Sequence, residues 1–506
     1  MSGLLGAARA NVLLGPIGLG VAIATVVVLA RWLGPELYGE YAAILAMLSW
    51  VLLVSESGCN AGMQRYYLSA KGAGARYSLY RTLQFRRWIV VGLVTLLALA
   101  IEPAWTKWAR LPAERWSPAL IVLICVVGGL MLHAQLATSA LLAGFGHRRT
   151  IIVSTGMSIV RACLLAIVCV FSRNPVALVG ALAAASSLEA AILHTLAVRE
   201  FGLESTPLPP HLANLAQQHG LVGLVDKLGT QASGPALIIL VFSGPHSPAE
   251  IAMFALATDL LQRALGVINL PLSNLFVPMM NEARDDDALL LHQIDRFGGI
   301  AIILNTLAVG GIMAALPAGI PILFSEVYRP AVLIAFIWIG PLFLEAVARM
   351  VLGAALLQSR EYKWLLFYNL FSGAAAAITI VVISNVGILV AVSIIGVLRV
   401  VFVALLILKS VNTRLVSVGK LAPWRLAAVA TVAVSLSLIL QSLAAEWSNV
   451  WRLFGGLAVY GGVVLIALHQ MSLIPDPSYS ALLRLAGRYD YLIVRLIRGD
   501  RSNGDR

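Results

Sequence analysis

The chain has 506 residues, of which 60% are apolar and only 12% are charged, and its mean hydropathy is +0.89. This composition excludes an ordinary soluble globular protein and places the chain in a lipid bilayer. The formal net charge of +12 is explained better by the basic loops of a membrane protein than by nucleic-acid binding, so no nucleic-acid partner is expected.

Apolar runs of about 20 residues, long enough as helices to cross the hydrocarbon core, recur along the whole chain. A membrane β-strand alternates apolar and polar residues, whereas runs such as Ala22 to Ala30 are continuously apolar. We therefore predict an all-α polytopic membrane protein with about 14 transmembrane helices. The expected spans are 11–33, 39–63, 87–106, 117–144, 150–172, 175–198, 220–243, 249–280, 297–319, 330–357, 362–384, 386–408, 424–444 and 452–473.

The first span is expected to stay in the protein, because the small-residue sequence Ala8-Arg9-Ala10 precedes the apolar run instead of following it as a cleavage site would. The second span carries Glu56, Asn60 and Gln64 at every fourth residue, which draws a polar stripe on one face. The stripe either faces a water-filled cavity or packs against a polar neighbouring helix.

Several middle spans carry single polar side chains. Isolated charges that fit either a structural partner or a transport role are Arg161, Glu189 and Arg399. Histidines expected to be hydrogen-bonded core residues rather than ligands are His133, His194 and His469. The four cysteines all lie in apolar spans and are expected to pack there: Cys59, Cys125, Cys163 and Cys169.

The seventh span contains Asp226 and Lys227 as neighbours, which point about 100° apart on a helix and cannot pair well with each other. At least one of them needs a partner on another helix or water. Two further spans carry an acid four residues before an arginine, at Asp259 with Arg263 and Glu345 with Arg349. Each of these pairs either neutralises itself or lines a cavity.

Lys and Arg collect on one side of the predicted membrane topology, which makes that side cytoplasmic and places both termini there. The tail SALLRLAGRYDYLIVRLIRG is expected to lie on the inner leaflet as a basic amphipathic helix. No segment between spans is long enough for a soluble catalytic domain, and no phosphate-cradling, HExxH or clustered metal-ligand motif is present. We therefore expect no enzyme activity, no cofactor and no metal site.

The two halves of the chain repeat each other weakly. GEYAAILAML at 39–48 aligns with AMFALATDLL at 252–261, and LLAGFGHRRTIIV at 141–153 aligns with ALLQSREYKWLLF at 355–367, with nearly equal offsets. The repeat predicts five regions: an N-lobe (1–203) with spans 1 to 6, a cytoplasmic Pro-rich linker (204–219), a C-lobe (220–410) with spans 7 to 12, spans 13 and 14 (411–474), and a basic tail (475–506).

The motifs LARWLGPELYGEYAAILAMLSWVLLVSESG, LLAGFGHRR, ILFSEVYRPAVLIAFIWIGPL and LLQSREYK cover both halves of the chain. Together they resemble the polysaccharide-transport branch, the Wzx-like oligosaccharide flippases, of the multidrug/oligosaccharidyl-lipid/polysaccharide exporter superfamily. The resemblance implies two six-helix lobes around a central cavity and alternating access. Lipid II flippases are a poorer match, because several cavity arginines are expected in their first lobe and the first span offers only Arg31.

The resemblance implies a flippase that moves polyprenyl-pyrophosphate-linked oligosaccharide units for O-antigen, capsule or exopolysaccharide synthesis across a bacterial inner membrane. Its partners would be that lipid-linked oligosaccharide, a coupling proton or sodium ion, membrane lipids and other polysaccharide-assembly proteins. Cavity residues expected to bind substrate are Lys227, Arg263, Arg349, Asn60, Gln64 and Asn269. Residues expected to couple an ion are Asp226, Asp259 and Glu56. The alternatives are an ion-coupled multidrug exporter of the same superfamily and an integral-membrane polysaccharide polymerase or ligase.

Overall fold

The computed structural model describes residues 2–67, 69–108, 116–143, 147–202, 206–207, 214–215, 224–225, 227–282, 287–353, 356, 362–412 and 424–471. Within these ranges every regular element is a helix, and twelve helices are long and apolar enough to cross a membrane. The predicted all-α polytopic membrane fold is therefore confirmed. The basic tail and most of the predicted linker lie outside the described residues.

The helices agree with the predicted spans once two features are considered. Helix α1 (Ser2–Glu56) runs through both of the first two spans, with a kink at Gly34, whose φ of 74° belongs to the left-handed region that glycine adopts without a Cβ clash. The seventh span is described only in part, as helical residues 227–232 and the short helix α8 (Pro235–Phe242). Both features lower the number of separate long helices without removing an apolar span.

One compact unit comprises Met1–Leu256 together with Tyr368–Ala391. Its helices, in addition to α1 and α8, are α2 (Cys59–Tyr66), α3 (Ala73–Trp108), α4 (Pro118–Ala143), α5 (His147–Ser172), α6 (Pro175–Phe201) and most of α13 (Tyr362–Val382). Helix α4 packs on α6, α3, α1 and α2, and α1 packs on α5. Helix α4 is therefore the central helix of this unit among those described.

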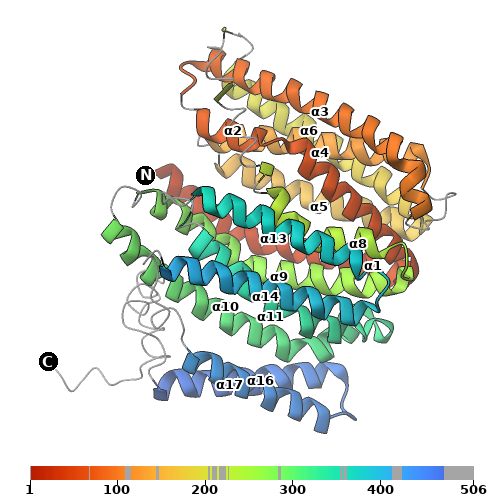
Figure 1. The fold of residues 1–506 in the computed structure, drawn as a ribbon, viewed down its shortest axis with the longest axis vertical. Coiled ribbons are helices and arrows are strands. Elements are labelled where there is room, and N and C mark those ends of the chain that lie inside the picture. Colours follow the sequence, from red (N-terminus) through yellow and green to blue (C-terminus); the bar gives the residue numbers. More distant parts are fainter. Residues whose placement is uncertain are drawn as a thin grey trace. The chain divides into compact units, whose positions relative to one another are not determined.

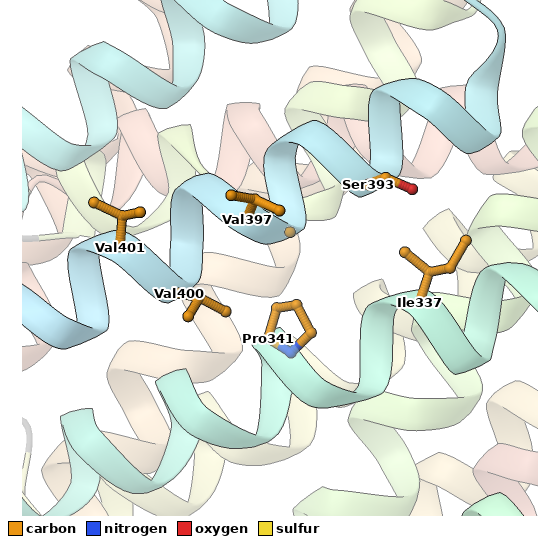
Figure 2. A pocket seen from close by; sticks show the side chains of 7 residues that line it. Ile337, Pro341, Ser393, Val397, Val400 and Val401 are labelled. Atoms are coloured by element: carbon orange, nitrogen blue, oxygen red, sulfur yellow. The ribbon is translucent and has the colours of Figure 1, made fainter.

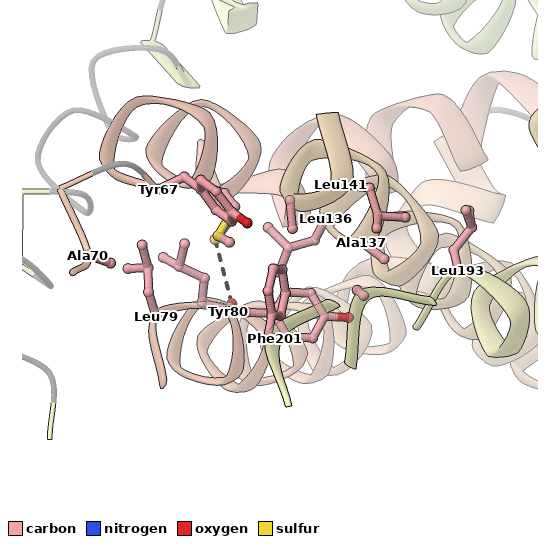
Figure 3. Close-up of a cluster of buried hydrophobic side chains, with 14 of the residues drawn as sticks. Tyr67, Ala70, Leu79, Tyr80, Leu136, Ala137, Leu141, Leu193 and Phe201 are labelled. Carbon is pink, nitrogen blue, oxygen red and sulfur yellow. Dashed lines mark hydrogen bonds between the residues drawn. The ribbon is translucent and has the colours of Figure 1, made fainter. Parts of the chain in front are cut away.

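The core of this first unit lies between α2, α3, α4 and α6. Tyr67, Tyr80, Leu136, Leu193 and Phe201 all belong to it, and Figure 3 shows their side chains converging between these helices. Local sequence sets the start of α6, where the Asn174 side chain accepts a hydrogen bond of 2.9 Å from the Val176 amide. Packing of this kind fixes the rotation of each helix and hence which polar side chains point inward.

The second compact unit comprises Ala257–Phe367 together with Val392–Arg506. Its helices are the larger part of α9 (Pro248–Glu282), α10 (Asp287–Phe324), the 3-10 turn η1 (Glu326–Tyr328), α11 (Ala331–Ala348), the π-helical turn η2 (Arg349–Gly353), most of α14 (Ile388–Asn412), α16 (Trp424–Leu443) and α17 (Asn449–Met471). Helices α16 and α17 lie side by side, and both pack on α10 (Figure 1).

The close approach of α17 to α10 depends on a glycine. The Tyr460 hydroxyl donates a hydrogen bond of 2.7 Å to the Leu307 carbonyl, and the Tyr460 ring occupies the space that a side chain at Gly310 would need. This contact joins the last described helix to α10. The domain boundaries expected from the internal repeat remain a prediction.

Candidate functional site

Glu56 and Lys227 form an ion pair within the first unit. Glu56 is the last residue of α1, because Ser57 and Gly58 both have positive φ and interrupt the helix there. Its side chain is 8% exposed, whereas that of Lys227, in helical residues 227–232, is 47% exposed. Glu56 Oε1 is buried without a hydrogen-bond partner. Lys227 thus has the interhelical salt bridge that was one of its two expected roles, and about half of its side chain remains exposed.

Two glycines hold residues 227–232 against α13. A Cβ at Gly229 would lie 2.9 Å from the backbone nitrogen of Leu370, and one at Gly373 would lie 2.7 Å from the Gly229 Cα. Real side chains do not approach backbone atoms this closely, so both positions need glycine. The glycine contact therefore helps to place the segment that carries Lys227.

The polar stripe predicted for the second span is divided between two helices. Glu56 ends α1, whereas Asn60 and Gln64 lie on α2. Asn60 Nδ2 donates to Gln135 Oε1 at 3.4 Å, and Asn60 Oδ1 accepts from Arg87 at 2.9 Å. Asn60 thus packs against polar neighbours, while Gln64 is exposed.

Arg87 is a buried cation at the position where the third expected span, 87–106, begins. Its side chain is fully buried, and besides Asn60 it binds the Leu132 carbonyl of α4. Helix α3 already begins at Ala73, so Arg87 falls on its buried face one turn after Leu83. The sequence does carry a signal for this burial. Arg87 lies in the same every-fourth-residue row of α3 as the apolar residues Leu79, Leu83 and Val91, which are all buried.

His133 and His194 face each other in the same unit. His133 Nε2 lies 3.2 Å from His194 Nδ1, which also lies 2.9 Å from the Tyr80 hydroxyl, and His133 Nδ1 is bound by the Gln84 side chain. Both histidines are thus hydrogen-bonded within the bundle. The side chain of His469 lies outside the described residues.

Arg161 and Glu189, which appear isolated in the sequence, form an ion pair between α5 and α6. The two charges neutralise each other across the α5–α6 contact, so the pair fits a structural role.

The second unit contains a cluster in which one carboxylate binds two arginines. Glu345 Oε1 lies 2.8 Å from Arg349 Nε, and Glu345 Oε2 lies 2.8 Å from Arg399 Nη1. The Arg399 guanidinium also lies over the Trp338 ring, 4.5 Å from its centroid. Both arginines and the carboxylate lie in candidate membrane spans, Ala331–Leu352 and Ile388–Val411.

Arg349 is the more accessible arginine of this cluster. Its side chain is 28% exposed, whereas that of Arg399 is 6% exposed and that of Glu345 is 15% exposed. Arg349 also begins the π-helical turn η2, and such turns within α-helices are frequent at functional sites. The cluster can therefore present one guanidinium to a ligand while Arg399 balances the carboxylate.

The remaining expected site residues are placed as follows. Arg263 Nε lies 2.8 Å from Asp259 Oδ2 on α9, and both side chains are one third exposed. Asn269, farther along α9, has its Oδ1 buried without a hydrogen-bond partner. Asp226 lies outside the described residues.

An apolar groove of about 310 Å³ lies between α11 and α14 in the second unit. Figure 2 shows Ile337 and Pro341 of α11 facing Ser393, Val397 and Val400 of α14. The groove has no charged lining residue, so it offers no counter-charge to an ionic ligand. Among the described residues, no group of three or more His, Cys, Asp or Glu side chains could hold a metal ion.

Comparison with known proteins identifies a family and a fold. A family model described as "polysaccharide biosynthesis protein" matches residues 10–284, more than half of the chain. No curated protein matches the sequence. Among solved structures, the lipid II flippase MurJ in its inward closed conformation is similar with a TM-score of 0.67 and 11% identity, over 93% of this chain and 99% of that one.

A multidrug resistance transporter and a second MATE protein have a similar fold. An inward-facing multidrug resistance MATE family transporter gives a TM-score of 0.58 at 11% identity, over 78% of this chain and 94% of its own. A MATE protein in complex with MaL6 gives 0.56 at 14% identity, over 81% of this chain and 96% of its own. At these identities the likeness shows a shared fold.

Proposed function

The chain belongs to the polysaccharide biosynthesis protein family, within the multidrug/oligosaccharidyl-lipid/polysaccharide exporter superfamily, and from this premise we propose that it is a flippase for lipid-linked oligosaccharides. The substrate would be an oligosaccharide repeat unit on a polyprenyl pyrophosphate, used for O-antigen, capsule or exopolysaccharide synthesis. Transport would proceed by alternating access of two lobes, with the boundaries 1–203 and 220–410 expected from the internal repeat.

The observation that carries this proposal is the cluster of Glu345 with two arginines. A charge inside a bilayer costs about 3 kcal/mol or more unless it is paired, so two arginines held on one carboxylate within membrane spans mark a candidate site for an anionic ligand. Pyrophosphate is a multiply charged anion whose oxygens match the planar donors of guanidinium. Arg349, the more exposed arginine, would exchange its bond with Glu345 for a pyrophosphate oxygen, while Arg399 keeps the carboxylate paired.

Lys227 is the second cation that we assign to substrate. It is paired with Glu56 but remains 47% exposed, and an ammonium has three N–H donors, so it can bind a phosphate oxygen beside the carboxylate. We assign Arg263, Asn60, Gln64 and Asn269 to the polar lining along the path, and Asp226, Asp259 and Glu56 to ion coupling. The first four would bind sugar hydroxyls or phosphates, and the carboxylates would bind a proton or sodium ion.

We further propose that the protein acts in a bacterial inner membrane with both termini in the cytoplasm, beside other polysaccharide-assembly proteins, and that it is not an enzyme. The fold is shared with multidrug transporters as well as with a lipid II flippase, so an ion-coupled drug exporter is the alternative within transport. An integral-membrane polymerase or ligase is the alternative outside it.

The experiment that tests this function follows the leaflet distribution of lipid-linked oligosaccharide in host cells depleted of the protein. The glycan is expected to accumulate on the inner leaflet, and wild-type protein is expected to relieve the accumulation. The variant Arg349→Gln should fail to do so at equal expression, whereas the matched control Arg161→Gln should succeed. A glycan that reaches the outer face normally but stays unpolymerised would support the enzyme alternative. Normal glycan handling with increased drug sensitivity would support the exporter.

A further inference from the structure

Helices α11 and α14 of the second unit meet at a proline and a glycine. A Cβ at Gly396 would lie 3.2 Å from Cγ of Pro341, so the ring of Pro341 sits directly against the bare backbone of α14. Gly396 and its neighbour in the lining, Ser393, are small, and the groove of about 310 Å³ is the hollow that they leave opposite Ile337 and Pro341 (Figure 2). The groove therefore follows from small residues on α14 that face a proline on α11.

A second contact joins the same two helices about one turn farther along, where Arg399 binds Glu345. This contact is buried, since Trp338, on which Arg399 stacks, has no exposed surface and Arg399 has little. Two valines that line the groove, Val397 and Val401, are instead 65% and 49% exposed. In a membrane protein, exposed apolar side chains within a span face lipid. The groove is thus open to lipid, while Arg399 and Trp338 pack inside the protein.

The groove and the charged cluster follow one another along α11. Ile337, Pro341, Glu345 and Arg349 recur at every fourth residue, which spans about 18 Å of helix. Arg349 reaches back toward the groove, because its Nε lies 2.8 Å from Glu345 Oε1. In the proposed orientation α11 runs from the outer to the inner surface, so Arg349 lies near the inner end of the span Ala331–Leu352 and the groove lies near its middle. A lipid of the inner leaflet has the same order, with its phosphate at the inner surface and its chain toward the middle of the bilayer.

The groove by itself does not select one kind of chain. Its lining carries no charge, and lipid tails are as apolar as the groove, so a chain gains little by leaving the bilayer for it. Its volume is at the lower end of the range for ligand pockets, about 300–1,000 Å³, which suits part of one chain. Selection must therefore come from the group to which the chain is attached. A pyrophosphate carries more negative charge than the single phosphate of a phospholipid, and guanidinium binds such oxygens two at a time.

From this arrangement we propose that the groove between α11 and α14 binds the isoprene units next to the pyrophosphate of a polyprenyl-linked substrate, while Arg349 binds the pyrophosphate itself. The proposal rests on the proposed flippase function, which supplies a substrate of this chemistry. The prenyl chain is bonded directly to the pyrophosphate, so a molecule held at Arg349 has its first isoprene units within reach of Pro341. The contact of Pro341 with Gly396 is then the point at which the chain passes from the protein into the bilayer.

Photo-crosslinking tests which lipid occupies the groove. The full chain is placed in phosphatidylcholine bilayers with a polyprenyl pyrophosphate that carries a diazirine in its second isoprene unit, and the labelled residues are identified by mass spectrometry. We expect labels on Ile337, Val397 and Val401. Excess unlabelled polyprenyl pyrophosphate should abolish them, whereas the same excess of phosphatidylglycerol should not. Equal competition by phosphatidylglycerol would overturn the proposal, because the groove would then be an ordinary lipid-facing surface.

Filling the groove should exclude the prenyl chain. Val397→Trp places a large ring there at a lipid-facing position, and Val432→Trp, at a side chain of α16 that is 55% exposed, is the matched control. Labelling of Ile337 should fall about tenfold in Val397→Trp and stay at the wild-type level in Val432→Trp. Val401→Trp fills the same groove one turn away and serves where Val397→Trp does not fold. Normal labelling in a folded variant with a filled groove would contradict the proposal.

The anchoring role of Arg349 has its own test. Because the groove does not select a chain, Arg349→Gln should also lower the labelling of Ile337 about tenfold, whereas the control Arg161→Gln, in the first unit, should not. Unchanged labelling in Arg349→Gln would overturn the assignment of one molecule to both the arginine and the groove.

Leaflet measurements on the same variants in liposomes separate this inference from the flippase function. If both hold, Val397→Trp should move lipid-linked oligosaccharide more slowly than Val432→Trp does. Transport by wild type without any prenyl label in the groove would overturn the inference and leave the flippase function standing. A prenyl label in the groove without transport under any condition would contradict the flippase function, while the binding of the prenyl chain would stand.

Discussion

Lys227 and Glu56 form an ion pair although 171 positions separate them in the sequence, which ties the start of the seventh span to the end of α1. Burying a carboxylate to 8% exposure is costly unless a cation pairs with it. The pair is therefore a structural contact, and the half-exposed Lys227 side chain is the part of it that the proposed substrate would meet.

Removing Lys227 should destabilise the first unit. Lys227→Ala leaves the Glu56 carboxylate buried without its partner, and we expect a loss of about 2 kcal/mol, less than for a fully buried pair because Lys227 is half exposed. Denaturant unfolding of the purified protein measures the change. The double variant Glu56→Gln with Lys227→Gln should recover most of the lost stability, and a double variant no more stable than Lys227→Ala would argue against the pair.

Exchanging the two charges separates folding from transport. In Glu56→Lys with Lys227→Glu the ion pair can re-form, so we expect near wild-type stability. Transport should fall at least about tenfold, because the exposed end of the pair would then repel a phosphate. Leaflet assays and thermal unfolding on the same preparations check both parts, and full transport by the exchanged protein would assign the pair to structure alone.

The two arginines on Glu345 should respond differently to the same substitution. Arg349→Gln removes the exposed cation and leaves Arg399 to pair with Glu345, so stability should change by less than about 1 kcal/mol while transport falls about tenfold. Arg399→Gln removes a buried cation and its stacking on Trp338, and should cost about 3 kcal/mol of stability. Equal effects of the two variants on stability would contradict this division of roles.

The Arg161–Glu189 pair should behave as a contact between helices and nothing more. A double-mutant cycle with Arg161→Gln and Glu189→Gln, followed by unfolding, should give a coupling energy of about 1 kcal/mol. All three variants should transport at close to the wild-type rate at equal expression. A strong transport defect in a stable double variant would place this pair on the transport path.

The contact between residues 227–232 and α13 should not tolerate side chains. Gly229→Val would drive a side chain into the α13 backbone, and we expect a loss of more than about 2 kcal/mol together with a loss of the Glu56–Lys227 pair. Gly180→Val, at a position in α6 with open space around it, is the matched control and should change stability by less than about 1 kcal/mol. Similar losses in both variants would mean that the close approach is not required.

The spans themselves followed from the sequence because continuous apolar runs of membrane length have few other stable conformations. The direction of the polar stripe in the second span was harder to predict, because the expected helix continued through Ser57 and Gly58. The positive φ values of these two residues end α1. Arg87 was missed for a related reason: the third span was expected to begin at residue 87, whereas α3 begins at Ala73.

Partners across helices could not be obtained from the sequence at all. The i and i+4 spacing correctly placed Arg263 beside Asp259 and Arg349 beside Glu345. By contrast, contacts between residues on different helices depend on helix rotation, which packing decides. These contacts are the ion pairs Arg399–Glu345 and Glu56–Lys227 and the hydrogen bond between His133 and His194. Whether these residues bind substrate or an ion stays a prediction.

The central claim is that the protein moves a lipid-linked oligosaccharide between leaflets, and the most direct measurement uses purified protein in liposomes. Host lipid-linked oligosaccharide is distributed over both leaflets, and a membrane-impermeant oxidant then modifies only the glycans on the outer one. Wild-type protein should raise the modified fraction from about half to nearly all, because inner-leaflet lipid is carried outward as the oxidant acts. A modified fraction that stays at the level of protein-free liposomes, with folded protein present, would contradict the account.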